Sequence, residues 1–181
     1  MSTAAAIDPT DTVEDAAEET LEALQPLTDE ERLQQASSVV RKHAIAAAGI
    51  GLIPMPVVDF AALTALQLNL LRKLSSTYDV RFAEEIGKKA VASLLAGYAP
   101  VAFAMPAASL IKSIPLIGQT TGVLAMSALA GATTYAVGKV FIQHFESGGT
   151  FLNFDPTAVR EYYREQFKEG REVVADGKKP G

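Results

Sequence analysis

Apolar side chains recur at helical spacing along most of the chain, and no segment alternates for long at the period of a strand. The first helical run follows a Thr28-x-x-Glu31 capping pattern, which predicts a helix over about 29–50. Two glycines and two prolines in 49–56 end this helix, because proline lacks the amide hydrogen that a continuing helix needs. The pattern therefore predicts an all-α fold whose first hairpin turns in this segment.

A second helix is predicted to start at Pro56, since proline suits a first helical turn. Asp59 stands in that turn, where a carboxylate faces the positive end of the helix dipole. The helix is apolar on nearly all sides until Arg72-Lys73, so it is buried in protein or in lipid. We interpret Pro54, Pro56 and Asp59 as a hairpin tip. The alternative for Asp59 is a transport or proton-relay role.

The middle of the chain is almost free of charge. Lys112 is the only charged residue between Ala90 and Gly138, and it separates two uncharged stretches, 90–111 and 113–138. A helix that crosses a bilayer core needs about 20 apolar residues, so both stretches are long enough. We expect a central Ala- and Gly-rich apolar helical hairpin with Lys112 and Pro115 at its tip.

Small residues stand four apart at the start of the second uncharged stretch, at Gly118, Gly122 and Ala125. Such spacing lets two helices approach closely, which drives association where lipid removes the hydrophobic incentive. We expect these three residues to pack against another helix. In a soluble bundle the same glycines would be turn or close-packing residues.

The last predicted helix starts at Asp155-Pro156, a capping residue followed by a proline in the first turn. Its apolar face is aromatic, and basic and acidic residues line its two flanks. We interpret it as a solvated helix that docks its aromatic face. The alternative is a helix lying at an anionic membrane surface.

Charge is distributed unevenly. Residues 1–31 contain ten of the 21 acidic residues and no Lys or Arg, so the remainder, with 16 basic and 11 acidic residues, carries a net charge of +5 although the whole chain has −5. We expect 1–27 to be a disordered acidic tail, because it cannot bury enough apolar surface to offset its ordering entropy. It lacks the pattern of a signal peptide, which predicts a cytosolic start.

The domain organisation follows from these segments. We expect about five helices arranged in hairpins: a helical hairpin domain over 28–145, a linker and amphipathic C-terminal helix over 146–172, and a flexible tail over 173–181. The 181 residues suit one domain.

The residues that would carry chemistry are missing. The chain has no cysteine. Residues 131–140 resemble a phosphate-binding loop but have six residues between the glycines and no Ser or Thr after the lysine. His43 and His144 lack a partner at metal-binding spacing, and we expect each to be an interfacial histidine with a water partner. We therefore predict a non-enzymatic protein with no cofactor, no metal and no nucleic-acid partner.

Three roles fit this pattern. In the first, the central hairpin lies in or on a lipid membrane, with only Lys112 at its tip and many basic residues on the other side; both termini then face the cytoplasm of a bacterial inner membrane. In the second, the chain is a soluble cytoplasmic scaffold that buries 90–138 by self-association. In the third, the hairpins oligomerise into a small pore or transporter.

One stretch resembles a bacterial family of domains of unknown function found in YcjF-like membrane proteins and attached to Era-like GTPases. The resemblance covers roughly 37–145 and rests on Arg41-Lys42-His43-Ala44, Ile53-Pro54-Met-Pro56, Asp59-Phe60-Ala-Ala-Leu63-Thr64-Ala65-Leu66-Gln67 and Tyr78. It implies a helical, membrane-associated module and a GTPase partner supplied in cis or in trans. Since this chain has no G domain, such a GTPase would act in trans. Apart from the resemblance, we expect the chain to form homo-oligomers, and its partner could also be another cytosolic protein. Asp79 departs from the family pattern, where glycine is expected after Tyr78.

Overall fold

The computed structural model describes the backbone of residues 27–52, 56–104 and 117–177, and side chains within 27–52, 61–96 and 125–177. All regular structure in these ranges is helical, which confirms the predicted all-α fold with about five helices. The elements are α2 (Asp29–Ile50), α3 (Pro56–Thr77), α4 (Glu84–Ala104), α6 (Ile117–Glu146), the short 3-10 helix η1 (Phe151–Asn153) and α7 (Arg160–Gly177). The predicted tail 1–27 lies almost wholly outside the described residues.

The predicted start of α2 is confirmed in atomic detail. The backbone N of Glu31 donates to Thr28 Oγ1 over 3.3 Å, and the backbone N of Thr28 donates to Glu31 Oε2 over 2.9 Å. This reciprocal pair satisfies two amides that the first helical turn leaves free. The chain from Arg32 to Gly181 forms one unit, and the helical packing described below lies within it.

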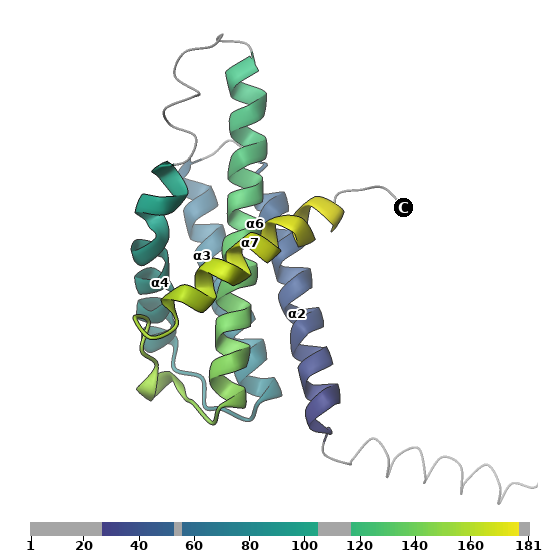
Figure 1. The fold of residues 1–181 in the computed structure, drawn as a ribbon, viewed down its shortest axis with the longest axis vertical. Coiled ribbons are helices and arrows are strands. Elements are labelled where there is room, and N and C mark those ends of the chain that lie inside the picture. The colour runs from purple at the N-terminus through teal and green to yellow at the C-terminus, as the bar shows by residue number, and fades with distance from the viewer. Residues whose placement is uncertain (1–26, 53–55, 105–116, 178–181) are drawn as a thin grey trace, which may run out of the picture. The chain divides into compact units, whose positions relative to one another are not determined.

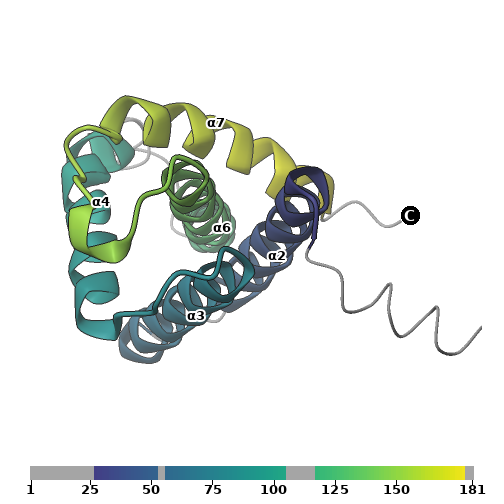
Figure 2. The same ribbon diagram turned by 90° about the horizontal axis from the view of Figure 1, so that it is seen from below.

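Helix α6 is the axis of this unit. Figure 2, viewed along α6, shows α2, α3, α4 and α7 around it. Every residue from Ala130 to Gly138 is buried, and so are Val140 and Phe141. A helix that is apolar on all sides is a buried one. Residues 130–138 of the second uncharged stretch therefore form the core of a helical bundle.

The turn between α3 and α4 shows why the departure at Asp79 is tolerated. Asp79 has φ +52°, in the left-handed region that glycine adopts most easily. Asp and Asn enter this region more readily than other side chains. The amide of Val80 then donates to the Ser75 carbonyl over 2.7 Å and closes the turn.

Aromatic side chains close the end of the bundle where α6 ends. Phe141 stacks on Phe154 with ring centroids 4.6 Å apart, and Phe151 packs against both Phe141 and Phe145. The ring of Phe82 meets Phe151 edge-on. This cluster holds the segment 150–154 against the end of α6 and so determines from which side the chain enters the last helix.

The last helix begins and ends later than the sequence predicts. Asp155 Oδ1 accepts hydrogen bonds from the backbone N and the hydroxyl of Thr157, which forms a turn in place of a first helical turn. The helix begins at Arg160 and continues to Gly177, past the predicted limit of 172, because Val174 is buried.

Candidate functional site

The structure leaves most predicted tip residues outside its described part. Pro54, Lys112 and Pro115 lie in 53–55 and 105–116, which it does not describe. Pro56 is the first residue of α3 and Asp59 lies in the first turn of that helix. The roles assigned to these residues stay predictions.

The predicted packing residues lie near the start of α6. Gly118 and Gly122 belong to the first two turns of α6, where side-chain surroundings are not described. Ala125 is exposed. Further along the same small-residue series, Ala132 and Ala136 are fully buried. The described packing of α6 thus lies one to three turns beyond the predicted motif.

Close helix contacts are made by two glycines that were considered from the sequence only as part of a phosphate-binding loop and not for packing. A Cβ placed on Gly131 would lie 2.9 Å from the Ala44 carbonyl oxygen and would also collide with Val174 of α7. A Cβ on Gly138 would collide with Val40 of α2. Gly131 and Gly138 stand seven residues apart, so both face α2 on nearly the same side of α6. This spacing is the signal that could have found them.

Helix α7 crosses α6 through a third glycine. A Cβ on Gly170 would lie 3.0 Å from the backbone oxygen of Ala132 and 2.9 Å from the Tyr135 Cβ. Glu169, the residue before Gly170, accepts a hydrogen bond from the Tyr135 hydroxyl over 2.7 Å. Figure 1 shows α7 passing obliquely across α6. The crossing holds a strongly charged helix at the level of 131–135.

Buried polar groups connect α6 to the first hairpin. The Ser127 hydroxyl donates to the Ala48 carbonyl of α2, and Gln67 Nε2 of α3 lies 3.4 Å from Thr134 Oγ1. Each bond satisfies a group that would be costly to bury alone. Together they set the heights of α2 and α3 along α6.

The two histidines bind protein groups. His43 is buried: its Nδ1 donates to the Val39 carbonyl over 2.7 Å, and its Nε2 lies 3.1 Å from Asn69 Oδ1. The expected water partner is therefore wrong for His43, because the α2 and α3 hairpin supplies a polar side chain at that height. His144 Nε2 faces the Thr150 carbonyl at 2.9 Å. No cluster of three metal-binding side chains occurs among the described residues.

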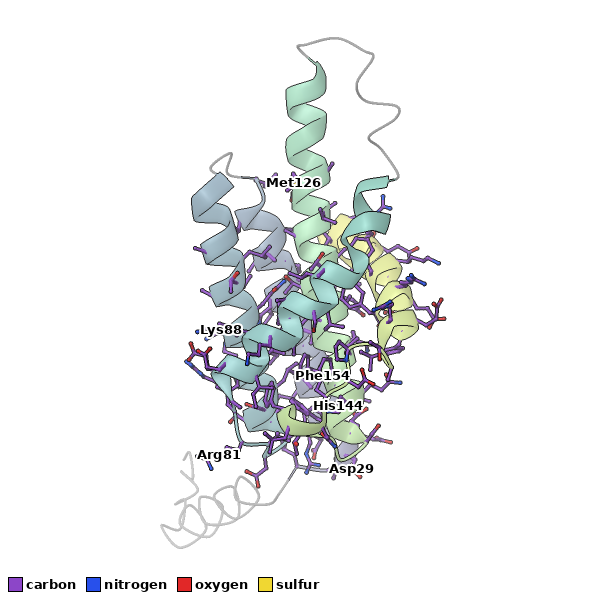
Figure 3. The ribbon with its side chains drawn as sticks, turned by 90° about the vertical axis from the view of Figure 1, so that its left-hand side faces the viewer. Asp29, Arg81, Lys88, Met126, His144 and Phe154 are labelled. Carbon is purple, nitrogen blue, oxygen red and sulfur yellow. The ribbon has the colours of Figure 1, made fainter. Side chains whose placement is uncertain are left out.

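One end of the bundle exposes large apolar side chains. Ile45 and Leu52 near the end of α2 are exposed, and Met126 of α6 is 54% exposed. Figure 1 shows α6 continuing past the ends of α2, α3 and α4 on this side, and Figure 3 shows Met126 at about the height where these helices end. We call this the apolar end: 45–52 of α2, the first turns of α3 from Pro56, the last turns of α4 up to Ala104, and 117–128 of α6.

The opposite end is polar. Arg81, Lys88 and His144 lie away from the apolar end in Figure 3. Tyr78 donates its hydroxyl to Glu146 Oε1 over 3.1 Å there, and burial together with the Glu146 charge raises the pKa of Tyr78. Lys88 bridges Glu84 and Glu85. The two ends of the bundle along α6 thus differ in polarity: one exposes apolar side chains and the other charged ones.

The described residues hold one helix that is long and apolar enough to cross a membrane, Ala125–Glu146, with a mean hydropathy of 1.2; 67% of its most apolar window is buried inside the bundle. By these properties it also fits the core helix of a soluble protein. The predicted span 113–138 overlaps this candidate from Ala125 onward. Most of the predicted span 90–111 lies outside the described side chains, so it stays a prediction.

The chain matches a family model described as "Domain of unknown function (DUF697)" over residues 16–172. It is 38% identical over 141 residues to magnetosome membrane protein 22 of Magnetospirillum gryphiswaldense, an alignment that covers 77% of this chain and 72% of that protein. No solved structure matches it.

Proposed function

Because the chain belongs to the DUF697 family of domains of unknown function, we propose that it is a non-enzymatic, membrane-associated helical module. Its apolar end inserts into the bacterial inner membrane, and its polar end, with both termini, faces the cytoplasm. There it serves a protein partner, a GTPase acting in trans, and it forms homo-oligomers.

The observation that carries the proposal is the polarity of the bundle along α6. The apolar end exposes Ile45, Leu52 and Met126, and the stretches 43–50 of α2 and 117–138 of α6 carry no charge. The other exposed large apolar residues of the described part, Leu27, Leu33 and Leu152, are close in sequence to charged residues. An exposed apolar surface without nearby charges marks an interaction or membrane surface. The relative named as a magnetosome membrane protein adds support for the membrane.

The position of α7 limits the depth of insertion. Its exposed flanks carry both acidic and basic residues, and such charges stay out of hydrocarbon. It crosses α6 at 131–135. Only 117–130 of α6 lies beyond the crossing, which is about 21 Å of helix at 1.5 Å per residue, against a core of about 30 Å. This favours a hairpin that dips into the bilayer over a span by the whole of 113–138.

Cell fractionation tests the membrane assignment. We expect the full-length protein in the membrane pellet after an alkaline carbonate wash, with release only by detergent. Recovery in the detergent-free supernatant as a defined oligomer would contradict insertion and establish the soluble scaffold.

Two matched substitutions locate the inserting end. Met126 at the apolar end and Leu152 near the polar end are both large, exposed apolar residues, and Leu152 is 84% exposed. We expect Met126→Glu to move much of the protein into the carbonate supernatant, because a carboxylate resists hydrocarbon. Leu152→Glu should stay in the pellet. Equal behaviour of the two variants would refute the assignment of the inserting end.

The GTPase rests on the resemblance alone. Its test is affinity purification of the full-length protein from its own bacterium in the presence of a non-hydrolysable GTP analogue or of GDP. We expect a GTP-binding protein to be enriched with the analogue. Its absence under both conditions would remove this part of the proposal and leave the membrane module standing.

A further inference from the structure

Three helices carry a pair of adjacent basic residues at the border between their charged part and their long uncharged part. All six side chains are exposed. A seventh basic residue, half-buried, follows the uncharged stretch of α6. We call these residues the basic belt: Arg41-Lys42 of α2, Arg72-Lys73 of α3, Lys88-Lys89 of α4 and Lys139 of α6.

Contacts between the helices bring the belt residues to one height. Val40 of α2 lies against Gly138, so the α2 pair sits beside Lys139.

The other two pairs follow from their own contacts. His43 faces Asn69 at 3.1 Å, which places the α2 pair within about one turn of Arg72. On α4, Gly87 faces Leu71, and Arg72 Nη2 lies 3.5 Å from Glu84 Oε2. Residues distant in sequence are thus brought to similar heights on three outer helices and on α6, on the sides of the bundle that α7 leaves uncovered (Figure 2).

The belt stands where the charged positions of these helices end. From the belt toward the apolar end, no charged residue occurs over 43–50 of α2, 60–71 of α3, 90–104 of α4 or 117–138 of α6, and Asp59 in the first turn of α3 is the one charge of these four helices beyond those ranges. The pattern is the same on helices that run in opposite directions along the chain. Because four helices share this border, it indicates one boundary across the bundle between charged and uncharged surroundings and not a local feature of each sequence segment.

Most belt cations are available to an external anion. Glu84 and Glu85 engage Lys88, and Glu84 also reaches Arg72. The other five, Arg41, Lys42, Lys73, Lys89 and Lys139, form no ion pair with a residue in the described part of the chain. The nearest acid of α7, Glu169, accepts a hydrogen bond from Tyr135.

The height of the belt suits the headgroup layer. Lys139 lies eight residues of α6 beyond Gly131, so its backbone is about 12 Å on the polar side of the start of the α7 crossing. The headgroup region adds about 5–7 Å on each side of the hydrocarbon core, so the long side chain of the lysine is what reaches this layer. Lys and Arg extend their charged ends along such a boundary on flexible stems.

We propose that the basic belt binds anionic phospholipid headgroups of the leaflet into which the apolar end inserts. This inference rests on the proposed membrane association and adds lipid selectivity to it. The charge of the belt is complementary to an anionic leaflet, and each Lys or Arg near such a surface contributes measurable attraction.

The test uses full-length protein in a neutral detergent, titrated with phosphatidylglycerol or with phosphatidylcholine, with thermal unfolding as the readout. A ligand that binds the folded state stabilises it by RT ln(1 + L/Kd), where L is the free ligand concentration, so the rise in Tm depends on the ratio of its concentration to its Kd. We expect phosphatidylglycerol to raise Tm at lower concentration than phosphatidylcholine. Glycerol phosphate, which has the anion without acyl chains, should not raise Tm. Equal effects of the two lipids, or equal stabilisation by glycerol phosphate, would overturn the proposal.

Variants assign the effect to the belt. Lys89→Gln should raise the phosphatidylglycerol concentration that gives a fixed rise in Tm about fivefold, and Lys42→Gln with Lys89→Gln about 25-fold. Arg81→Gln removes one exposed charge on the far side of Lys88 from the apolar end (Figure 3) and should change it little. Equal effects of Lys89→Gln and Arg81→Gln would refute the belt.

Failure of the two proposals can be told apart. If carbonate releases the wild-type protein, membrane insertion fails and the belt proposal fails with it. If the protein is retained but shows no preference for phosphatidylglycerol, insertion stands and only the belt proposal fails.

Discussion

Substitution of Gly131 by alanine should loosen the junction of three helices. The added Cβ would lie 2.9 Å from the Ala44 carbonyl oxygen and 3.1 Å from the Ala48 Cβ, and it would collide with Val174 on the other side. The oxygen belongs to the α2 backbone and cannot turn away as a side chain would. Overpacking of this kind costs up to about 3 kcal/mol. Alanine returns roughly 1 kcal/mol in helix propensity, so we expect a net loss of about 2 kcal/mol.

Gly49→Ala is the matched control. Gly49 also lies in a helix, but a Cβ there would meet nothing within 4 Å. Thermal unfolding in one detergent, followed by circular dichroism, should show a Tm about 4–8 °C lower for Gly131→Ala, on the scale of about 2–4 °C per kcal/mol for a chain of this size. Gly49→Ala should match or exceed wild type. A Gly131→Ala variant as stable as Gly49→Ala would show that α2, α6 and α7 do not pack as described.

Two further predictions concern pH. Tyr78 keeps its proton in the folded state, because burial and the Glu146 charge raise its pKa; stability should therefore decline above about pH 10, where the unfolded tyrosine ionises, and Tyr78→Phe should lessen that decline in unfolding titrations. Hydrogen bonds from the Thr157 hydroxyl and amide lower the pKa of Asp155 below 3.8. Its stabilisation is present above that pH and lost as pH falls further, so Asp155→Asn should flatten the acid limb of the stability profile, whereas a parallel loss at every pH would contradict this account.

The helices themselves could be predicted from the sequence because their signals are local. The Thr28 and Glu31 capping pair and Pro56 mark starts that the structure reproduces. The start at Asp155 was wrong since its carboxylate binds Thr157 in a turn, and a pattern of residue types does not separate a turn from a first helical turn.

Packing partners could not be predicted, because they depend on contacts distant in sequence. The motif at Gly118 and Gly122 follows the rule of four-residue spacing, yet the described close contacts of α6 use Gly131 and Gly138 at seven-residue spacing. His43 was expected to face water, and only the folding of α3 against α2 brings Asn69 to it. In each case the sequence drew attention to the residue, but its packing partner comes from a distant segment and could not be predicted.

The same limit explains why the uncharged stretch 113–138 allowed both a membrane span and a soluble core. Hydropathy is similar along the whole stretch, whereas burial in the structure differs between its first and second halves. Beyond Gly131, α6 is enclosed by α2 and by the aromatic and apolar face of α7, which buries Tyr163, Phe167 and Val174. A full span would need α7 to leave α6 and expose that face to water, at roughly 1.5–3 kcal/mol for each large apolar side chain. The proposed insertion of 117–130 alone needs no such release. Under this proposal the membrane interpretation applies to the first half of α6 and the soluble-core interpretation to the second half.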